Sequence, residues 1–74
     1  MEGSEVRRIR EKFELTREEF AEFLCIAGYR SMINIETDFR NTSKFSAKVL
    51  SYLDSLPKNK ALGLIEELNR HEPK

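Results

Sequence analysis

Two side chains that can make paired hydrogen bonds lie four residues apart in the segment GYRSMINIETDFR, residues 28–40. The guanidinium of Arg30 can bind O6 and N7 of guanine, and the amide of Asn34 can bind N6 and N7 of adenine. A spacing of four residues puts both on one face of a helix, where both can enter the same groove of DNA. Ile33 lies beside them and would suit the methyl group of thymine.

Each of these residues also has a plainer interpretation. Arg30 can be a solvated surface arginine, and exposed asparagines such as Asn34 are common in short helices. Tyr29 either contacts phosphate through its hydroxyl or covers the neighbouring turn with its ring. Ile33 either reads DNA, lies in the core of a rotated helix or belongs to a protein interface. The choice depends on which face of the helix is buried.

Met32 and Ile35, spaced i and i+3, are expected to face the core from a helix over residues 29–37. Gly28 precedes this helix and supplies backbone freedom where the chain changes direction. The amides that start the helix there favour a phosphate. The opposite face of the helix would then carry Tyr29, Arg30, Ile33, Asn34 and Thr37.

Apolar residues recur at helical spacing along the chain, and strand-like alternation is hard to find. Val6, Ile9 and Phe13 form the stripe of a first helix, which Ser4 is expected to cap. The start of the chain has no apolar signal core, so a secretory signal is not expected. No apolar run approaches the ~18–20 residues that would span a bilayer.

Capping residues predict where two further helices begin, and apolar spacing predicts another. Thr16 and Glu19 form a T-x-x-E capping box for a short second helix over residues 17–24. Ser43 is expected to cap a fourth helix, and a fifth is expected over residues 58–70. The residues expected inside from the fourth helix are Phe45, Val49, Leu50 and Leu53. The fold class is therefore predicted as all-α with five helices.

The composition is that of one small soluble helical domain covering residues 1–74. The chain is 39% hydrophobic and 35% charged, too apolar for a disordered tail. Cys25 is its only cysteine, which excludes an internal disulfide and indicates a reducing, cytoplasmic environment. We expect Cys25 to be a semi-buried apolar group rather than a redox sensor. One histidine and one cysteine cannot build the usual zinc site, so neither a metal nor another cofactor is expected.

The net charge is zero, but the charges are segregated along the chain. Residues 28–60 hold six lysines and arginines against three acidic residues, and residues 11–22 hold five acidic residues against two basic ones. This distribution fits a molecule in which one face meets an anion and another does not. Glu36 is expected to be a structural carboxylate that pairs with Arg10 or Arg40, since a lone acid is a poor catalyst.

Two short helices joined by a tight turn, early in a five-helix chain, are the layout of a helix-turn-helix motif. The segments that carry a resemblance are Ile9-Arg10, Leu15-Thr16, Phe20-Ala21, Leu24, Ile35-Glu36 and KVLSYLDSLPKN. On these residues the chain resembles the Cro/C1-type (XRE-like) helix-turn-helix DNA-binding family over roughly residues 5–56. The helix-turn-helix core would cover residues 17–37. The family usually has glycine where Cys25 and Asp38 stand, often has proline where Thr42 stands, and commonly has a turn one residue shorter.

The resemblance implies that double-stranded DNA is bound by both helices of the motif. Arg17 would contact a base or phosphate from the start of the second helix, and residues after the third helix would hold the backbone in register. The expected DNA-contacting residues are Arg17, Gly28, Tyr29, Arg30, Ile33, Asn34, Thr37, Arg40, Asn41, Thr42 and Lys44.

The fifth helix has two interpretations. Its apolar stripe either closes the core of the monomer or pairs two protomers, and proteins of this class usually bind paired half-sites as dimers. The residues expected at such a homodimer interface are Leu62, Leu64, Ile65 and Leu68.

The function expected from these features is that of a small sequence-specific transcriptional regulator, most simply a repressor that occupies an operator as a dimer. The alternative is a protein-interaction module of a toxin–antitoxin or phage system, which Ile33 and Phe39 would serve. An enzyme is not expected, because no catalytic triad, metal cluster or phosphate loop is apparent.

Overall fold

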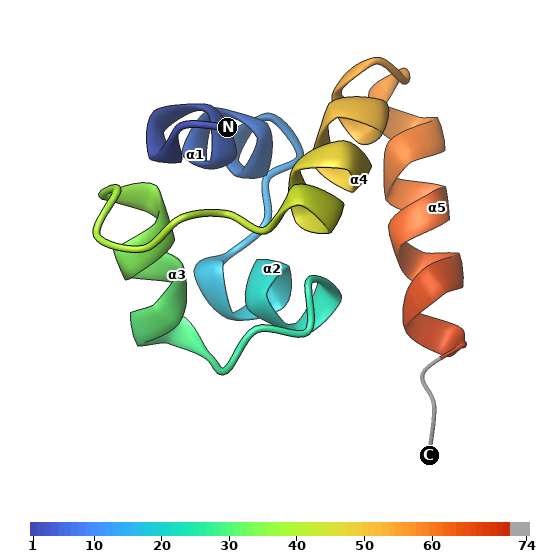
Figure 1. Cartoon of the computed structure of the whole chain (residues 1–74). Coiled ribbons are helices and arrows are strands. Elements are labelled where there is room, and N and C mark those ends of the chain that lie inside the picture. The colour runs from blue at the N-terminus through green and yellow to red at the C-terminus, as the bar shows by residue number, and fades with distance from the viewer. Residues whose placement is uncertain (72–74) are drawn as a thin grey trace.

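The computed structural model describes residues 1–71, which contain five helices and no strand. The predicted all-α class is therefore confirmed, and the predicted bounds of the second, third and fifth helices agree to within one residue. Figure 1 shows α2 below α1 and α4, with α3 on one side of α2 and α5 on the other. No helix among these residues is both long and apolar enough to cross a membrane. The helices are α1 Gly3–Lys12, α2 Arg17–Phe23, α3 Tyr29–Glu36, α4 Lys44–Asp54 and α5 Lys58–Arg70.

The first helix begins earlier than its sequence predicts. Its N-cap is Glu2, and Ser4 lies inside the first turn, so the prediction of a Ser4 cap is wrong. The amide of Gly3 instead donates to the carboxylate of Asp38 at 2.7 Å. A Cβ on residue 3 would overlap the carbonyl oxygens of Ile35 and Glu36. A contact with the segment that follows α3, rather than a local cap, therefore sets the start of α1.

The second helix begins with the predicted capping box. Thr16 accepts a hydrogen bond from the amide of Glu19 at 3.1 Å, and the Glu19 carboxylate accepts one from the amide of Thr16 at 2.9 Å. The second of these bonds lowers the pKa of Glu19, because it favours the charged form. Both contacts satisfy amides that have no partner within the helix, so α2 is held at its first turn despite its short length.

Three helices end on a left-handed residue that is not glycine: Glu14, Cys25 and Asp38, with φ between 57° and 62°. After α2, the amide of Cys25 donates to Glu22 and the amide of Ile26 donates to Ala21. This pair of bonds is a Schellman motif, which closes a helix and turns the chain sharply. Gly28, with φ 108°, then redirects the chain into α3 as predicted.

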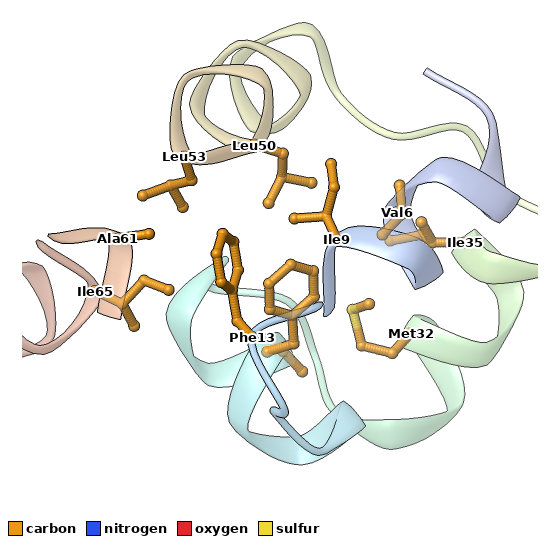
Figure 2. Close-up of a cluster of buried hydrophobic side chains, with 11 residues drawn as sticks. Val6, Ile9, Phe13, Met32, Ile35, Leu50, Leu53, Ala61 and Ile65 are labelled. Carbon is orange, nitrogen blue, oxygen red and sulfur yellow. The ribbon is translucent and has the colours of Figure 1, made fainter. Parts of the chain in front are cut away.

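One core joins all five helices. Figure 2 shows Leu53, Ala61 and Ile65 of α4 and α5 at one end of the core, and Val6, Met32 and Ile35 of α1 and α3 at the other. The core residues are Val6, Ile9, Phe13, Phe20, Ala21, Met32, Ile35, Leu50, Leu53, Ala61 and Ile65. These residues come from all five helices. α3 packs against both α1 and α2, and the burial of its own core residues there fixes its orientation.

The fourth helix agrees with prediction except at Phe45, and the fifth differs from the expected dimer interface at Ile65. Ser43 caps α4 by accepting a hydrogen bond from the amide of Ser46 at 3.1 Å. Phe45 is not inside, because its side chain is 75% exposed. A residue there lies about 80° around a helix from Leu53 and 140° from Leu50, at the edge of the buried stripe. In α5, Ile65 lies in the core, so it is not available to a dimer interface.

Candidate nucleic-acid interface

The two sides of α3 differ sharply in burial. Met32 is fully buried and Ile35 is 4% exposed, as the spacing predicts. Arg30 and Tyr29 are exposed, and Asn34 is half-buried on the side away from the core. Figure 1 shows that side of α3 at the edge of the molecule, with no other helix over it. The structure therefore leaves the predicted polar face of α3 open.

Ile33 lies between these two environments. It is half-buried, so it is neither a core residue nor a fully exposed surface residue. Its carbonyl oxygen accepts a hydrogen bond from the Thr37 hydroxyl at 2.8 Å. That bond occupies the only proton of the Thr37 hydroxyl, so this side chain can offer an incoming group only its oxygen lone pairs.

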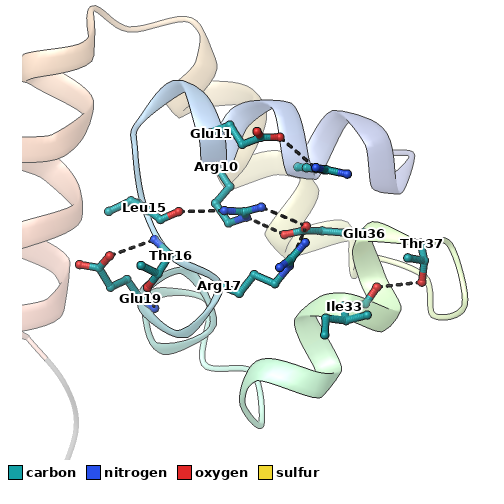
Figure 3. A network of polar contacts seen from close by, with 10 residues as sticks. Arg10, Glu11, Leu15, Thr16, Arg17, Glu19, Ile33, Glu36 and Thr37 are labelled. Atoms are coloured by element: carbon teal, nitrogen blue, oxygen red, sulfur yellow. Dashed lines mark hydrogen bonds and ion pairs between the residues drawn. The ribbon is translucent and has the colours of Figure 1, made fainter.

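Glu36 is the only buried charged residue among the described residues, and it holds the site together from within. Its side chain is 2% exposed and lies 2.8 Å from Nε of Arg10 and 3.2 Å from Nε of Arg17. Arg10 also donates to the carbonyl oxygen of Leu15 at 3.0 Å. Figure 3 shows the two guanidinium groups converging on this carboxylate from α1 and α2. The expected pairing with Arg10 is confirmed, and the second partner is Arg17 rather than Arg40.

Arg17 is held from two sides at the start of α2. Besides the bond to Glu36, its guanidinium lies 5.7 Å from the centre of the Tyr29 ring, a cation–π contact. The ring of Tyr29 thus covers Arg17. The side chain of Arg17 stays partly exposed, and Nε is the atom that bonds Glu36. Its terminal amino groups therefore remain available to a ligand, in a fixed position between α2 and α3.

The segment after α3 supplies further polar groups. Arg40 and Asn41 are exposed in the loop, and Lys44 is exposed at the start of α4. The amide of Arg40 donates to the carbonyl oxygen of Asn34 at 3.0 Å, which fixes the loop to the end of α3. Thr42 differs from the expectation. Its hydroxyl oxygen is buried without a hydrogen-bond partner among the described residues, so it does not reach the surface.

Arg17 pairs with Glu36, but three other cations, on α3 and in the segment that follows it, lack acidic partners among the described residues. Within residues 1–71, no ion pair involves Arg30, Arg40 or Lys44. By contrast, Arg8 and Lys12 of α1 both pair with Asp54 of α4. The open face of α3 is therefore bordered by unneutralised positive charge, which suits a polyanion.

Two features of the site have no signal in the sequence. The contact of Arg17 with both Glu36 and Tyr29 joins residues 12 and 19 positions apart and appears only when α2 and α3 are packed together. Phe39 is 85% exposed, although its loop is anchored on both sides by backbone bonds to α3.

Cys25 is exposed rather than semi-buried. No group of three metal-ligating side chains occurs in the described part of the chain.

No family model, curated protein or solved structure matches this chain. We therefore infer the function from the geometry of α2 and α3 and from the chemistry of their exposed side chains.

Proposed function

We propose that this chain is a sequence-specific regulator that binds duplex DNA with a Cro/C1-like helix-turn-helix motif. In this proposal α3 enters the major groove, where Arg30 reads guanine and Asn34 reads adenine. The observation that supports it most strongly is the orientation of α3. Met32 and Ile35 are buried while Arg30 and Asn34, four residues apart, project from the opposite side.

The start of α2 supports the same proposal. The terminal amino groups of Arg17 lie beside α3 and are held by Glu36 and Tyr29, so little side-chain entropy is lost when they bind a phosphate or base. Arg40, Asn41 and Lys44 would contact the backbone and set the register of the protein on the duplex, without reading sequence.

The turns around α3 support kinship with the Cro/C1-like family. Cys25 and Asp38 stand where that family usually has glycine, and both residues have a left-handed backbone. Glycine adopts that conformation most readily, so turns of this shape would account for the family's preference for glycine at both positions. Repression by occupying an operator is the simplest mechanism for a chain built in this way, because polymerase is then blocked without any further domain.

A second candidate function rests on Phe39. A phenylalanine that is 85% exposed on an anchored loop favours a protein partner. A salt series separates the two proposals. DNA binding through several phosphates weakens steeply as salt rises, whereas an apolar protein contact does not.

The direct test is selection of bound sequences from a random duplex library, followed by titration of the winning duplex. We expect one enriched motif and a linear fall of log K with log salt. Lys60→Ala should bind the winning duplex as the wild type does, because Lys60 is an exposed cation of α5, outside the proposed interface, with no ion pair in residues 1–71. No enrichment, together with binding that is insensitive to salt, would reject the proposal.

A further inference from the structure

An apolar groove lies between the end of α2, the start of α4 and the end of α5. It encloses about 350 Å³, within the range of about 300–1,000 Å³ that is usual for small-molecule sites. Its apolar lining consists of Phe23, Leu24, Phe45, Val49 and Leu68. Figure 1 shows α5 on the side of α2 opposite α3, and no lining residue belongs to the proposed DNA-contacting set. The groove is therefore not explained by DNA binding.

Two phenylalanines line the groove. Phe23 lies on α2, with its ring centre 6.4 Å from that of the buried Phe20. Phe45 lies on α4 and is 75% exposed, so most of its ring is open to a molecule in the groove. The face of an aromatic ring carries partial negative charge, so it attracts cations as well as apolar groups. A ligand with both an apolar body and a positive charge would gain from this wall in two ways.

The unpaired charge at the groove is also negative. Glu22 lines the groove from α2, is exposed and has no ion-pair partner within residues 1–71. His71 lines it too, but its Nε2 lies 3.6 Å from the Glu67 carboxylate, so a positive charge there is already paired. No lysine or arginine of the described residues lines the groove. A cation is therefore the charge that complements this site.

We propose that the groove binds a small lipophilic cation, an organic ammonium ion with an aromatic body. The body would lie against the rings and against Val49 and Leu68, and the ammonium group would lie beside Glu22. A neutral molecule would lack the contact with Glu22, and an organic anion would be repelled by it. Leu24 and Cys25 line the groove from the turn after α2, so a bound molecule would touch the segment that leads into α3. The inference does not depend on DNA binding.

The test uses three probes that share one apolar body: phenylbutylammonium, phenylbutanol and phenylbutyrate. Each is titrated into the full chain without DNA, and the amide chemical shifts of Leu24, Cys25, Val49 and Leu68 are followed by NMR. We expect saturable shifts with phenylbutylammonium, at a Kd in the low millimolar range or tighter. Phenylbutanol should bind more weakly, and phenylbutyrate about fivefold or more weakly than the ammonium. Absence of saturable shifts with the ammonium, or equal affinity for the ammonium and the butyrate, would overturn the proposal.

Glu22→Gln tests the charge of the site. The variant should bind phenylbutylammonium about threefold more weakly, bind phenylbutyrate more tightly and leave the affinity for phenylbutanol unchanged. Glu5→Gln is the matched control, because Glu5 is an exposed acid on α1, outside the groove, and its replacement changes the net charge equally. Equal losses from the two substitutions would show that net charge alone selects the cation, and would contradict a site at Glu22.

Phe45→Ser tests the apolar wall. It should weaken the binding of the ammonium and of the alcohol by about threefold or more. Phe39→Ser should weaken neither, because Phe39 is even more exposed and lies outside the groove. Circular dichroism should show unchanged helical content in both variants. Groove amide shifts that depend on protein concentration without a probe would assign the groove to a second copy of the chain and contradict the proposal. Failure of DNA binding would leave all of these results unaffected.

Discussion

The Glu36 carboxylate at the end of α3 lies 2.8 Å from Nε of Arg10 on α1, and almost no water reaches it. The same carboxylate also accepts a hydrogen bond from Arg17 on α2. One buried acid thus joins three helices, and it lies one residue beyond the buried stripe that orients α3. The position of the proposed reading face therefore depends on this contact as well as on apolar packing.

Glu36→Gln should destabilise the fold. The substitution leaves Arg10, which is almost fully buried, without a counter-charge, and removal of one partner from a buried ion pair costs about 3 kcal/mol or more. The free energy of unfolding in urea measures the effect. Glu66→Gln is the control, because Glu66 pairs with Arg70 on the exposed surface of α5 and should change stability by less than about 1 kcal/mol. Equal losses from both would contradict the role assigned to Glu36.

Gly3→Ala should also destabilise the protein, although alanine is the better helix former by about 1 kcal/mol. The added Cβ would overlap the carbonyl oxygens of Ile35 and Glu36, so α1 and the end of α3 would have to separate. Gly63→Ala is the matched control. Gly63 lies inside α5 with nothing within 4 Å of an added Cβ, so that variant should be stabilised. Thermal unfolding of the pair should therefore give shifts of opposite sign, and a stabilised Gly3→Ala would refute the packing described for α1.

Asp54 should make the protein sensitive to acid. Its hydrogen bonds with Arg8 and then with Lys12 lower its pKa from 3.8 to about 2. In the folded state it therefore binds fewer protons than in the unfolded chain, so its contribution to stability is complete above pH 3.8 and is lost as the pH falls through about 2. The ion pairs are partly exposed, so we expect a contribution of about 1 kcal/mol.

Asp54→Asn should remove this dependence. At neutral pH the variant should unfold more easily than the wild type, and the two should converge as the pH approaches 2. Chemical unfolding at a series of pH values measures both. A constant difference over the whole range would show that the carboxylate charge of Asp54 is not responsible.

Cys25→Gly should stabilise the protein by up to about 1 kcal/mol, because glycine adopts the left-handed backbone of this position without the steric cost of a Cβ. The exposed thiol contributes little packing that could be lost. Ala27→Gly, two residues later in the same turn and without a positive φ, should not be stabilised. A gain for Ala27→Gly equal to that for Cys25→Gly would mean that the turn has a different conformation in solution.

The sequence predicted those features that depend on near neighbours in the chain. The capping box at Thr16 and Glu19, the turn at Gly28 and the buried pair Met32 and Ile35 all lie within one or two helical turns, where spacing alone decides the outcome.

The wrong expectations concern features that depend on contacts between residues far apart in the sequence. The start of α1 depends on Gly3 meeting Asp38, 35 residues away, so a local cap at Ser4 was the wrong expectation. Phe45 lies at the edge of an apolar stripe, where spacing alone does not determine burial, and its side chain is 75% exposed. The second partner of Glu36 could not be predicted either, because Arg17 reaches it only when α2 and α3 are packed together.

The most direct measurement is the binding of Arg30→Ala and Asn34→Ala to duplexes that carry every single base-pair change in the selected site. Each variant should lose about 1–3 kcal/mol on the preferred duplex and lose discrimination at one position, guanine for Arg30 and adenine for Asn34. Lys44→Ala should weaken binding to all the duplexes to the same extent. Wild-type affinity and base preference in both the Arg30 and Asn34 variants would contradict the assignment of α3 as the reading helix.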